Sequence, residues 1–246
     1  MFVHGREAYR RNSYLVLYLF YKNILYVLPI FYFGFLSEFS GTAIYDNYMY
    51  QTFNVFFTGC PIIWYCTFDW QQTKEILLSD PSHYRIGLKN KCFNKFNYWR
   101  WYIYAIWQSA LILFLAFYTL EDSVSTFNGY TVYGSLMLDS TVIIQAIVVL
   151  VTVKLIISSH THTKLSWFLQ LGSVGFFYLQ FYCESIIKGM DLAGMFGVML
   201  SFISQYFLMF LFMTGFILVD YGMQFLDLQV QNVLEQLEDK EMKKEK

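Results

Sequence analysis

Two stretches of the chain carry polar side chains at helical spacing and end in a proline. Each set follows the pattern i, i+4, i+7, which places its three side chains on one helix face: Lys22, Tyr26 and Pro29, and then Asn54, Thr58 and Pro61. An ammonium binds a phosphate or a carboxylate, while amide and carbonyl oxygens accept hydrogen bonds from donors. The two faces together predict a site for a zwitterionic or anionic group.

Lys22 is the residue on which this prediction depends. It lies with Asn23 inside the apolar stretch Tyr14–Leu36, roughly 12 Å along a helix from its start, and therefore near the midplane of a bilayer. An ammonium there costs roughly 2.5–3.5 kcal/mol on insertion scales, so such residues usually face a cavity. The prolines free the carbonyls of Leu25 and Phe57, which a wet cavity or another helix must satisfy. The alternative is that Lys22 pairs with carbonyls of a neighbouring helix and has only a structural role.

The composition indicates a membrane protein. Hydrophobic residues make up 57% of the chain and charged residues 14%, well below the roughly 25% of soluble domains. The net charge of −1 argues against nucleic-acid binding, which needs a basic field. The four cysteines show no paired spacing, so neither a disulfide framework nor a cysteine metal site is indicated.

Six stretches have spanning length, and period-2 alternation is absent, so helices are favoured over a barrel. They are Tyr14–Leu36, Tyr48–Phe68, Trp101–Leu120, Val132–Ile157, Leu165–Ile187 and Met195–Val219. The predicted fold is therefore all-α, a polytopic membrane bundle of six transmembrane helices. Residues 1–219 would form the membrane domain, and residues 220–246 a cytoplasmic tail helix with a charged end.

The loops set the orientation. Basic residues concentrate before the first stretch, in residues 69–100 and in the tail, whereas the loops 37–47 and 121–131 carry only acidic charges. Because basic loops face the cytoplasm, both termini are predicted to be cytoplasmic.

The remaining polar residues predict less. Asp139 and Glu184 are expected near the outer ends of their spans, solvated or interfacial, and Lys154 is expected to extend to the membrane surface. His160 and His162 flank Thr161 in a short turn and predict no metal site. No catalytic residue is predicted.

The first part of the chain contains a series of short motifs: Val3–Arg6, Tyr9–Arg11, Phe20–Asn23, Phe39–Gly41 with Tyr45, Phe53–Thr58 with Pro61, Phe68–Asp69, and Pro81, Tyr84 and Gly87. In their order and spacing these motifs resemble the type IV P-type ATPases, the phospholipid flippases. The likeness is specific for residues 3–99, and the later spans match mainly in number, length and topology, so that the chain corresponds to spans five to ten of that family.

The resemblance implies ATP-driven movement of phospholipid from the exoplasmic to the cytoplasmic leaflet. It places Lys22, Asn23 and Asn54 on the headgroup path. The helical spacing adds Tyr26 and Thr58 beside them, and Pro29 and Pro61 are expected to kink their helices. It also implies a two-span accessory subunit at the loops 37–50 and 121–131. The expected location is the plasma membrane, Golgi or endosomal membranes.

The family's phosphorylated Asp-Lys-Thr-Gly motif, its nucleotide-binding and actuator domains and its first four spans have no counterpart here. This chain is therefore expected to bind no cofactor itself, with ATP and Mg²⁺ belonging to the complete enzyme and its N-terminal catalytic part. The alternative is a catalytically inactive, free-standing six-span protein that binds lipid or modulates a full-length flippase. An ion channel is disfavoured, because Lys22 is a single intramembrane cation without a ring of acidic residues.

Overall fold

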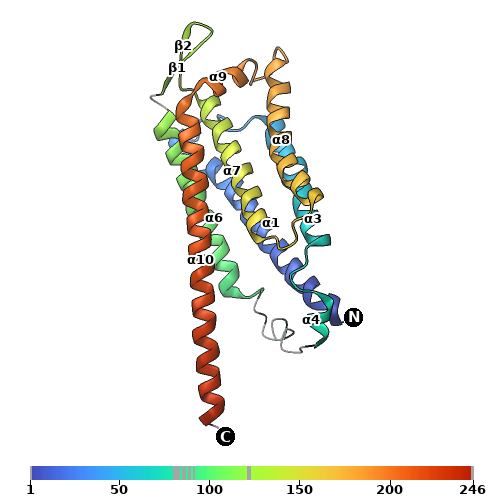
Figure 1. The fold of residues 1–246 in the computed structure, drawn as a ribbon. Coiled ribbons are helices and arrows are strands. Elements are labelled where there is room, and N and C mark those ends of the chain that lie inside the picture. Colours follow the sequence, from blue (N-terminus) through green and yellow to red (C-terminus); the bar gives the residue numbers. More distant parts are fainter. Residues whose placement is uncertain are drawn as a thin grey trace.

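The computed structural model describes residues 2–79, 84, 87, 90, 92–120 and 123–244, and these are mostly helical. The motif residue Pro81 lies outside the described residues. Figure 1 shows an elongated bundle with a hairpin of two strands at one end and both chain termini toward the other. The longest helices are α1 (Phe2–Leu36), α6 (Lys95–Leu120), α7 (Leu136–Ser158), α8 (Lys164–Ile186) and α10 (Ile203–Lys244).

Four helices of the described part are long and apolar enough to cross a membrane: His4–Leu36, Lys95–Leu120, Leu136–Ser158 and Ile203–Phe225. They coincide with the predicted first, third, fourth and sixth spans. The fifth predicted span corresponds to α8. This helix is as long as α7, but Gln170, Gln180 and Glu184 lower its hydropathy. Helix α7 is buried around most of its circumference, as expected for a helix that is apolar on all sides.

The stretch Tyr48–Phe68 is not one continuous helix, which corrects the prediction. It consists of α2 (Asn47–Thr52), the π-helix η1 (Phe53–Phe57) and α3 (Gly59–Phe68). The π-helix directly follows α2, and Thr58 separates it from α3. Pro61 explains the break, because it has no N–H for the Phe57 carbonyl. Short π-helical insertions of this kind often occur at functional sites. A further short helix, α4 (Lys74–Ser79), follows.

The fourth predicted span begins too early. Val132 lies in a hairpin formed by β1 (Val124–Phe127) and β2 (Tyr130–Tyr133), a small departure from an all-α fold. The turn residues Asn128 and Gly129 have φ of 51° and 82°, as a type I′ turn requires. Helix α7 then begins after Ser135, whose hydroxyl accepts a hydrogen bond from the Leu138 N–H.

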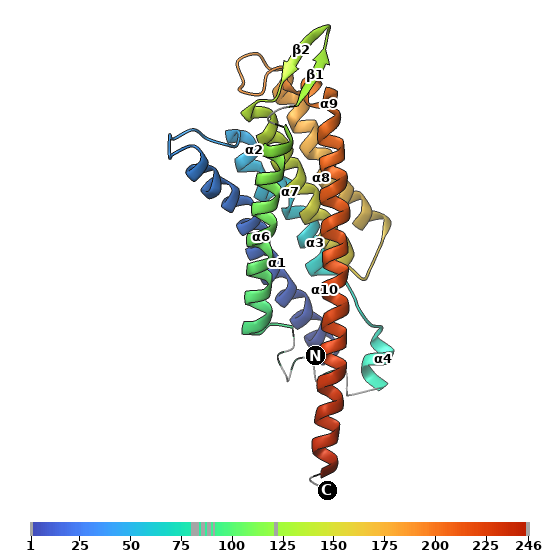
Figure 2. The same ribbon diagram turned by 90° about the vertical axis from the view of Figure 1, so that its left-hand side faces the viewer.

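The sixth predicted span is divided at Phe202 into α9 (Met195–Ser201) and α10. The hairpin holds α9, since the Ser125 hydroxyl donates to the Ser201 carbonyl at 2.7 Å and the Phe127 ring covers Gly197. Helix α10 passes the expected boundary at residue 220 without interruption and extends beyond the other helices (Figure 2).

Candidate functional site

The structure brings Lys22 and Thr58 together between α1 and the break that precedes α3. Lys22 is 3% exposed, and its Nζ donates to Thr58 Oγ1 at 2.6 Å. The Thr58 hydroxyl in turn donates to the Phe53 carbonyl at 2.9 Å. No carboxylate among the described residues lies within ion-pair distance of Lys22. The ammonium therefore has a neutral hydroxyl partner and retains the capacity to bind an anion.

Tyr26 belongs to a group of stacked aromatic rings on the same side of α1 as Lys22. Its ring stacks on Phe53 with centroids 3.9 Å apart and on Tyr45 at 4.8 Å. The Tyr45 hydroxyl donates to the Tyr26 carbonyl at 3.2 Å, which fixes the loop after α1 to the helix. The Phe53 ring centroid lies 5.9 Å from Lys22 Nζ, so Tyr26 supports the aromatic ring that lies near the ammonium.

The two predicted asparagines lie elsewhere. Asn23 and Asn54 are both exposed on the outer surface of α1 and η1, so neither shares the buried position of Lys22. An adjacent helix residue points about 100° away from its neighbour, which accounts for Asn23. The wider π-turn of η1 alters the i, i+4 relation between Asn54 and Thr58.

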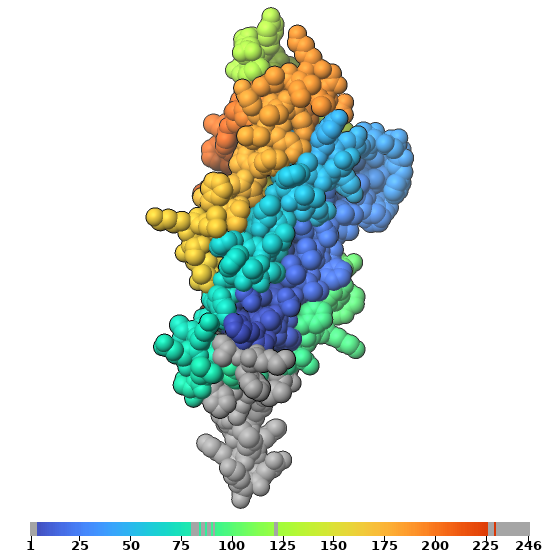
Figure 3. Space-filling model, turned by 90° about the vertical axis from the view of Figure 1, so that its right-hand side faces the viewer, coloured from blue at the N-terminus to red at the C-terminus, as the bar shows by residue number. Residues whose placement is uncertain are grey.

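The prolines have different positions. Pro29 is buried within α1, which continues as a helix through it to Leu36, and Pro61 is buried in the first turn of α3. The carbonyl of Phe57 accepts a hydrogen bond from the Ser173 hydroxyl of α8. Figure 3 shows the segment of α2 and α3, in cyan, lying between α1 in blue and α8 in yellow and orange. A neighbouring helix therefore satisfies this freed carbonyl.

A buried carboxylate joins three elements at the end of α3 that is nearer the chain termini. Asp69 Oδ2 accepts from Arg10 Nη2 at 2.8 Å, and Asp69 Oδ1 accepts from the backbone N–H groups of His160 and Thr161 at 2.8 Å each. Burial opposes ionisation of Asp69, but hydrogen bonds from His160, Thr161 and Arg10 outweigh it and hold the pKa of this carboxyl well below its usual range. The sequence indicated only a turn at His160 and Thr161.

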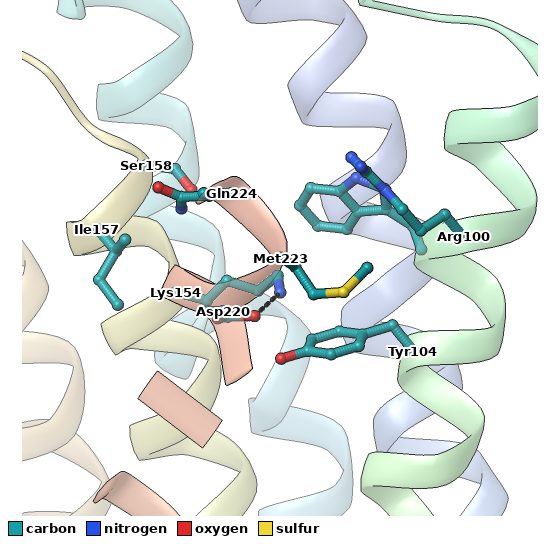
Figure 4. Close-up of a pocket in the computed structure, with 9 residues that line it drawn as sticks. Arg100, Tyr104, Lys154, Ile157, Ser158, Asp220, Met223 and Gln224 are labelled. Atoms are coloured by element: carbon teal, nitrogen blue, oxygen red, sulfur yellow. Dashed lines mark hydrogen bonds and ion pairs between the residues drawn. The ribbon is translucent and has the colours of Figure 1, made fainter. Parts of the chain in front are cut away.

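A second buried lysine was not anticipated. Lys154 of α7 was predicted to extend to the membrane surface, but it is only 8% exposed. Its Nζ lies 3.0 Å from Asp220 Oδ1 of α10, and the rings of Tyr104, Tyr21 and Trp101 surround it with centroids at 4.3, 4.6 and 4.8 Å. Figure 4 shows this pair on the wall of a pocket. Since α10 continues past Val219, it brings the carboxylate to the lysine.

Two further acidic residues are buried where the sequence predicted contact with water or the interface. Asp139 is 5% exposed and Glu184 is 6% exposed. Gln180 Nε2 donates to Glu184 Oε1 at 2.8 Å, a contact within one turn of α8. Both carboxyl groups thus lie inside the molecule, not at its surface.

Comparison with known proteins points to one family. The family model for the phospholipid-translocating P-type ATPase C-terminal region matches residues 1–232. The chain is 31% identical over 185 residues to the phospholipid-transporting ATPase IH of Mus musculus, covering 74% of this chain and 15% of that relative. It is 30% identical over 177 residues to the probable phospholipid-transporting ATPase 4 of Arabidopsis thaliana, covering 72% of this chain and 14% of that relative.

Proposed function

Because the chain belongs to the phospholipid-translocating P-type ATPases, we propose that it is the C-terminal membrane region of an ATP-driven lipid translocase. It is an integral membrane protein, and it spans about one-seventh of the length of the relatives above. In this proposal the complete enzyme moves phospholipid from the exoplasmic to the cytoplasmic leaflet, and this region supplies part of the headgroup path.

The observation that carries the proposal is that the Lys22 ammonium contacts a neutral hydroxyl and no carboxylate among the described residues. Every phospholipid headgroup contains a phosphate, and an ammonium without a carboxylate partner is a strong hydrogen-bond donor to it. The Thr58 hydroxyl, 2.6 Å from Lys22 Nζ, can turn from the Phe53 carbonyl toward the same phosphate. The exposed Asn23 and Asn54 would line the lipid-facing side of this path.

The complete topology follows from the same proposal. The broken segment from α2 to α3 and the helix α8 would add two crossings to the four apolar helices, giving six spans. Basic residues near both termini, which lie toward one end of the bundle in Figure 1, favour a cytoplasmic location for that end. The loops 37–50 and 121–131 would then face an accessory subunit.

The catalytic partners lie outside this region. In the proposal an N-terminal catalytic part binds ATP and Mg²⁺ and forms the phosphoenzyme, and the complete protein resides in the plasma membrane, Golgi or endosomal membranes. The alternative function is that of a free-standing six-span protein which binds lipid or modulates a full-length flippase.

A chimera tests the proposal. Residues 1–246 replace the corresponding region of a complete phospholipid-transporting ATPase, and ATP hydrolysis is measured with phosphatidylserine, phosphatidylethanolamine or phosphatidylcholine in mixed micelles. We expect Lys22→Ala to lower lipid-stimulated turnover about 10- to 100-fold, the equivalent of one charged hydrogen bond, while leaving nucleotide binding unchanged. Lys22→Glu should have a larger effect because it repels phosphate.

Lys188→Ala is the matched control, since Lys188 is exposed in the loop after α8. A fall in lipid stimulation for both lysines, or for neither, would contradict the headgroup role of Lys22. A chimera that binds lipid to the Lys22 site but never hydrolyses ATP would favour the free-standing alternative.

A further inference from the structure

Helices α1 and α3 are connected by two sets of polar contacts at different heights in the bundle. One is the bond from Lys22 Nζ to Thr58 Oγ1, and the other is the ion pair between Arg10 and Asp69 at 2.8 Å. At a rise of roughly 1.5 Å per residue, Arg10 and Lys22 are about 18 Å apart along α1. Thr58 and Asp69 are about 17 Å apart along α3 on the same basis. The matching separations allow both contacts to form at the same time, and sliding one helix along the other would break both.

The contacts around Asp69 are dense. Arg10 also donates to the Tyr65 hydroxyl at 3.0 Å, and Arg11 donates to the Thr67 carbonyl at 2.6 Å, so the last turn of α3 is held by α1. The Asp69 side chain is only 2% exposed. A buried carboxylate with several donors has a well-defined position, because each donor would otherwise be left unsatisfied.

The turn between α7 and α8 completes this attachment. Its His160 and Thr161 N–H groups bind Asp69, while the Thr161 hydroxyl accepts from the Trp70 N–H at 2.9 Å and donates to the Trp70 carbonyl at 3.1 Å. At the other end of α3, the Ser173 hydroxyl of α8 donates to the carbonyl of Phe57, which precedes the helix. Helix α3 is therefore fixed at both ends to the same two neighbours, α1 and the α7–α8 unit.

We propose that Asp69 is a positioning residue for the Lys22–Thr58 pair: it anchors α3 to α1 and to the α7–α8 turn, and so determines where the Thr58 hydroxyl meets the Lys22 ammonium. The inference deepens the proposed function and rests on it, because the pair matters to lipid only if Lys22 binds the headgroup. Asp69 itself touches no lipid in this scheme and acts through α3.

The test is a double-mutant cycle in the chimera, with the half-saturating concentration of the most stimulating phospholipid as the readout. Asp69→Asn should raise that concentration roughly two- to thirty-fold, the range that coupling through such networks spans. In a Lys22→Met background the same substitution should have little further effect, because the pair on which Asp69 acts is already lost. Sites this far apart normally give additive effects, so non-additivity is diagnostic.

Control variants separate positioning from simple stability. Asp69→Glu keeps the charge and should recover part of the lipid affinity, whereas Asp191→Asn removes an exposed carboxylate and should change nothing. Exchanging the partners, as Arg10→Asp with Asp69→Arg, should not restore affinity, for two reasons. Arginine cannot accept from the His160 and Thr161 N–H groups, and an aspartate at position 10 would lie against the buried Glu7, which Arg10 contacts at 3.0 Å. Hydrogen exchange of the Thr58, Gly59, Cys60 and Ile62 amides should increase in Asp69→Asn and should not change in Asp191→Asn.

The possible failures are distinguishable. If Lys22→Met leaves the half-saturating concentration unchanged, the proposed headgroup site is wrong. If Lys22→Met raises it but Asp69→Asn does not, or if the two effects add fully, the positioning role of Asp69 is wrong and the headgroup site stands. Full recovery by the exchanged pair would also overturn the positioning role, since the Arg10 contact alone would then suffice.

Discussion

Two buried lysines of this bundle have opposite surroundings. Lys154 faces the carboxylate of Asp220 inside a cage of aromatic rings, whereas Lys22 faces the neutral hydroxyl of Thr58. A buried charge is tolerated when it is paired and hydrogen-bonded. Lys154 meets this condition within the protein, and its pair connects α7 to α10. Lys22 meets it only in part, which is the property expected of a residue that binds an anion from outside.

The difference shows why burial alone does not identify a functional cation. Lys22 and Lys154 are 3% and 8% exposed, so their burial is similar. What distinguishes them is the charge of the nearest acceptor. Breaking the Lys154 pair should therefore act on stability, whereas replacing Lys22 should act on lipid.

The largest effect is expected at the paired lysine. Lys154→Met should lower the free energy of unfolding by about 3–5 kcal/mol, because it leaves Asp220 as an unpaired charge in a mostly buried position. The double variant Lys154→Met/Asp220→Leu should recover most of this loss, since apolar residues of similar volume replace the pair. Thermal unfolding of residues 1–246 in detergent measures the stability of the single and the double variant. A double variant no more stable than the single one would show that the pair is not the source of the effect.

The long helices and the contact between Lys22 and Thr58 followed from local patterns. Apolar runs indicated α1, α6 and α8, and the proline-based spacing predicted the contact between Lys22 of α1 and Thr58, which lies at the break before α3. The hairpin also has a local signal, the pair Asn128–Gly129, which is typical of a type I′ turn. Such features depend on nearby residues and on regular geometry.

Other features could not be predicted because they join distant parts of the chain. The contacts of Asp69 with His160 and of Lys154 with Asp220 depend on how the helices pack, and no local periodicity encodes that packing. Asn54 was misplaced for a different reason. The prediction assumed a regular α-helix, and η1 changes the number of residues per turn.

An intermediate effect is expected at Ser173. Ser173→Ala removes the donor to the Phe57 carbonyl and leaves that buried acceptor unsatisfied, which should cost about 1–3 kcal/mol of stability. Ser173→Thr retains a hydroxyl and serves as the matched variant, with the smaller cost of one added methyl group. Both are measured by thermal unfolding in detergent. If alanine and threonine were equally stable, another group would have to satisfy the Phe57 carbonyl.

The smallest effect on stability, and the sharpest test of the comparison, is expected at Lys22. Lys22→Met removes the charge and keeps the chain length, and the Thr58 hydroxyl retains its bond to the Phe53 carbonyl at 2.9 Å. No buried carboxylate among the described residues is left without its partner. The free energy of unfolding should therefore change by less than about 1.5 kcal/mol, as for other size-conserving replacements. A loss as large as that of Lys154→Met would mean that both lysines hold the fold together, and the distinction between a structural and a lipid-binding cation would disappear.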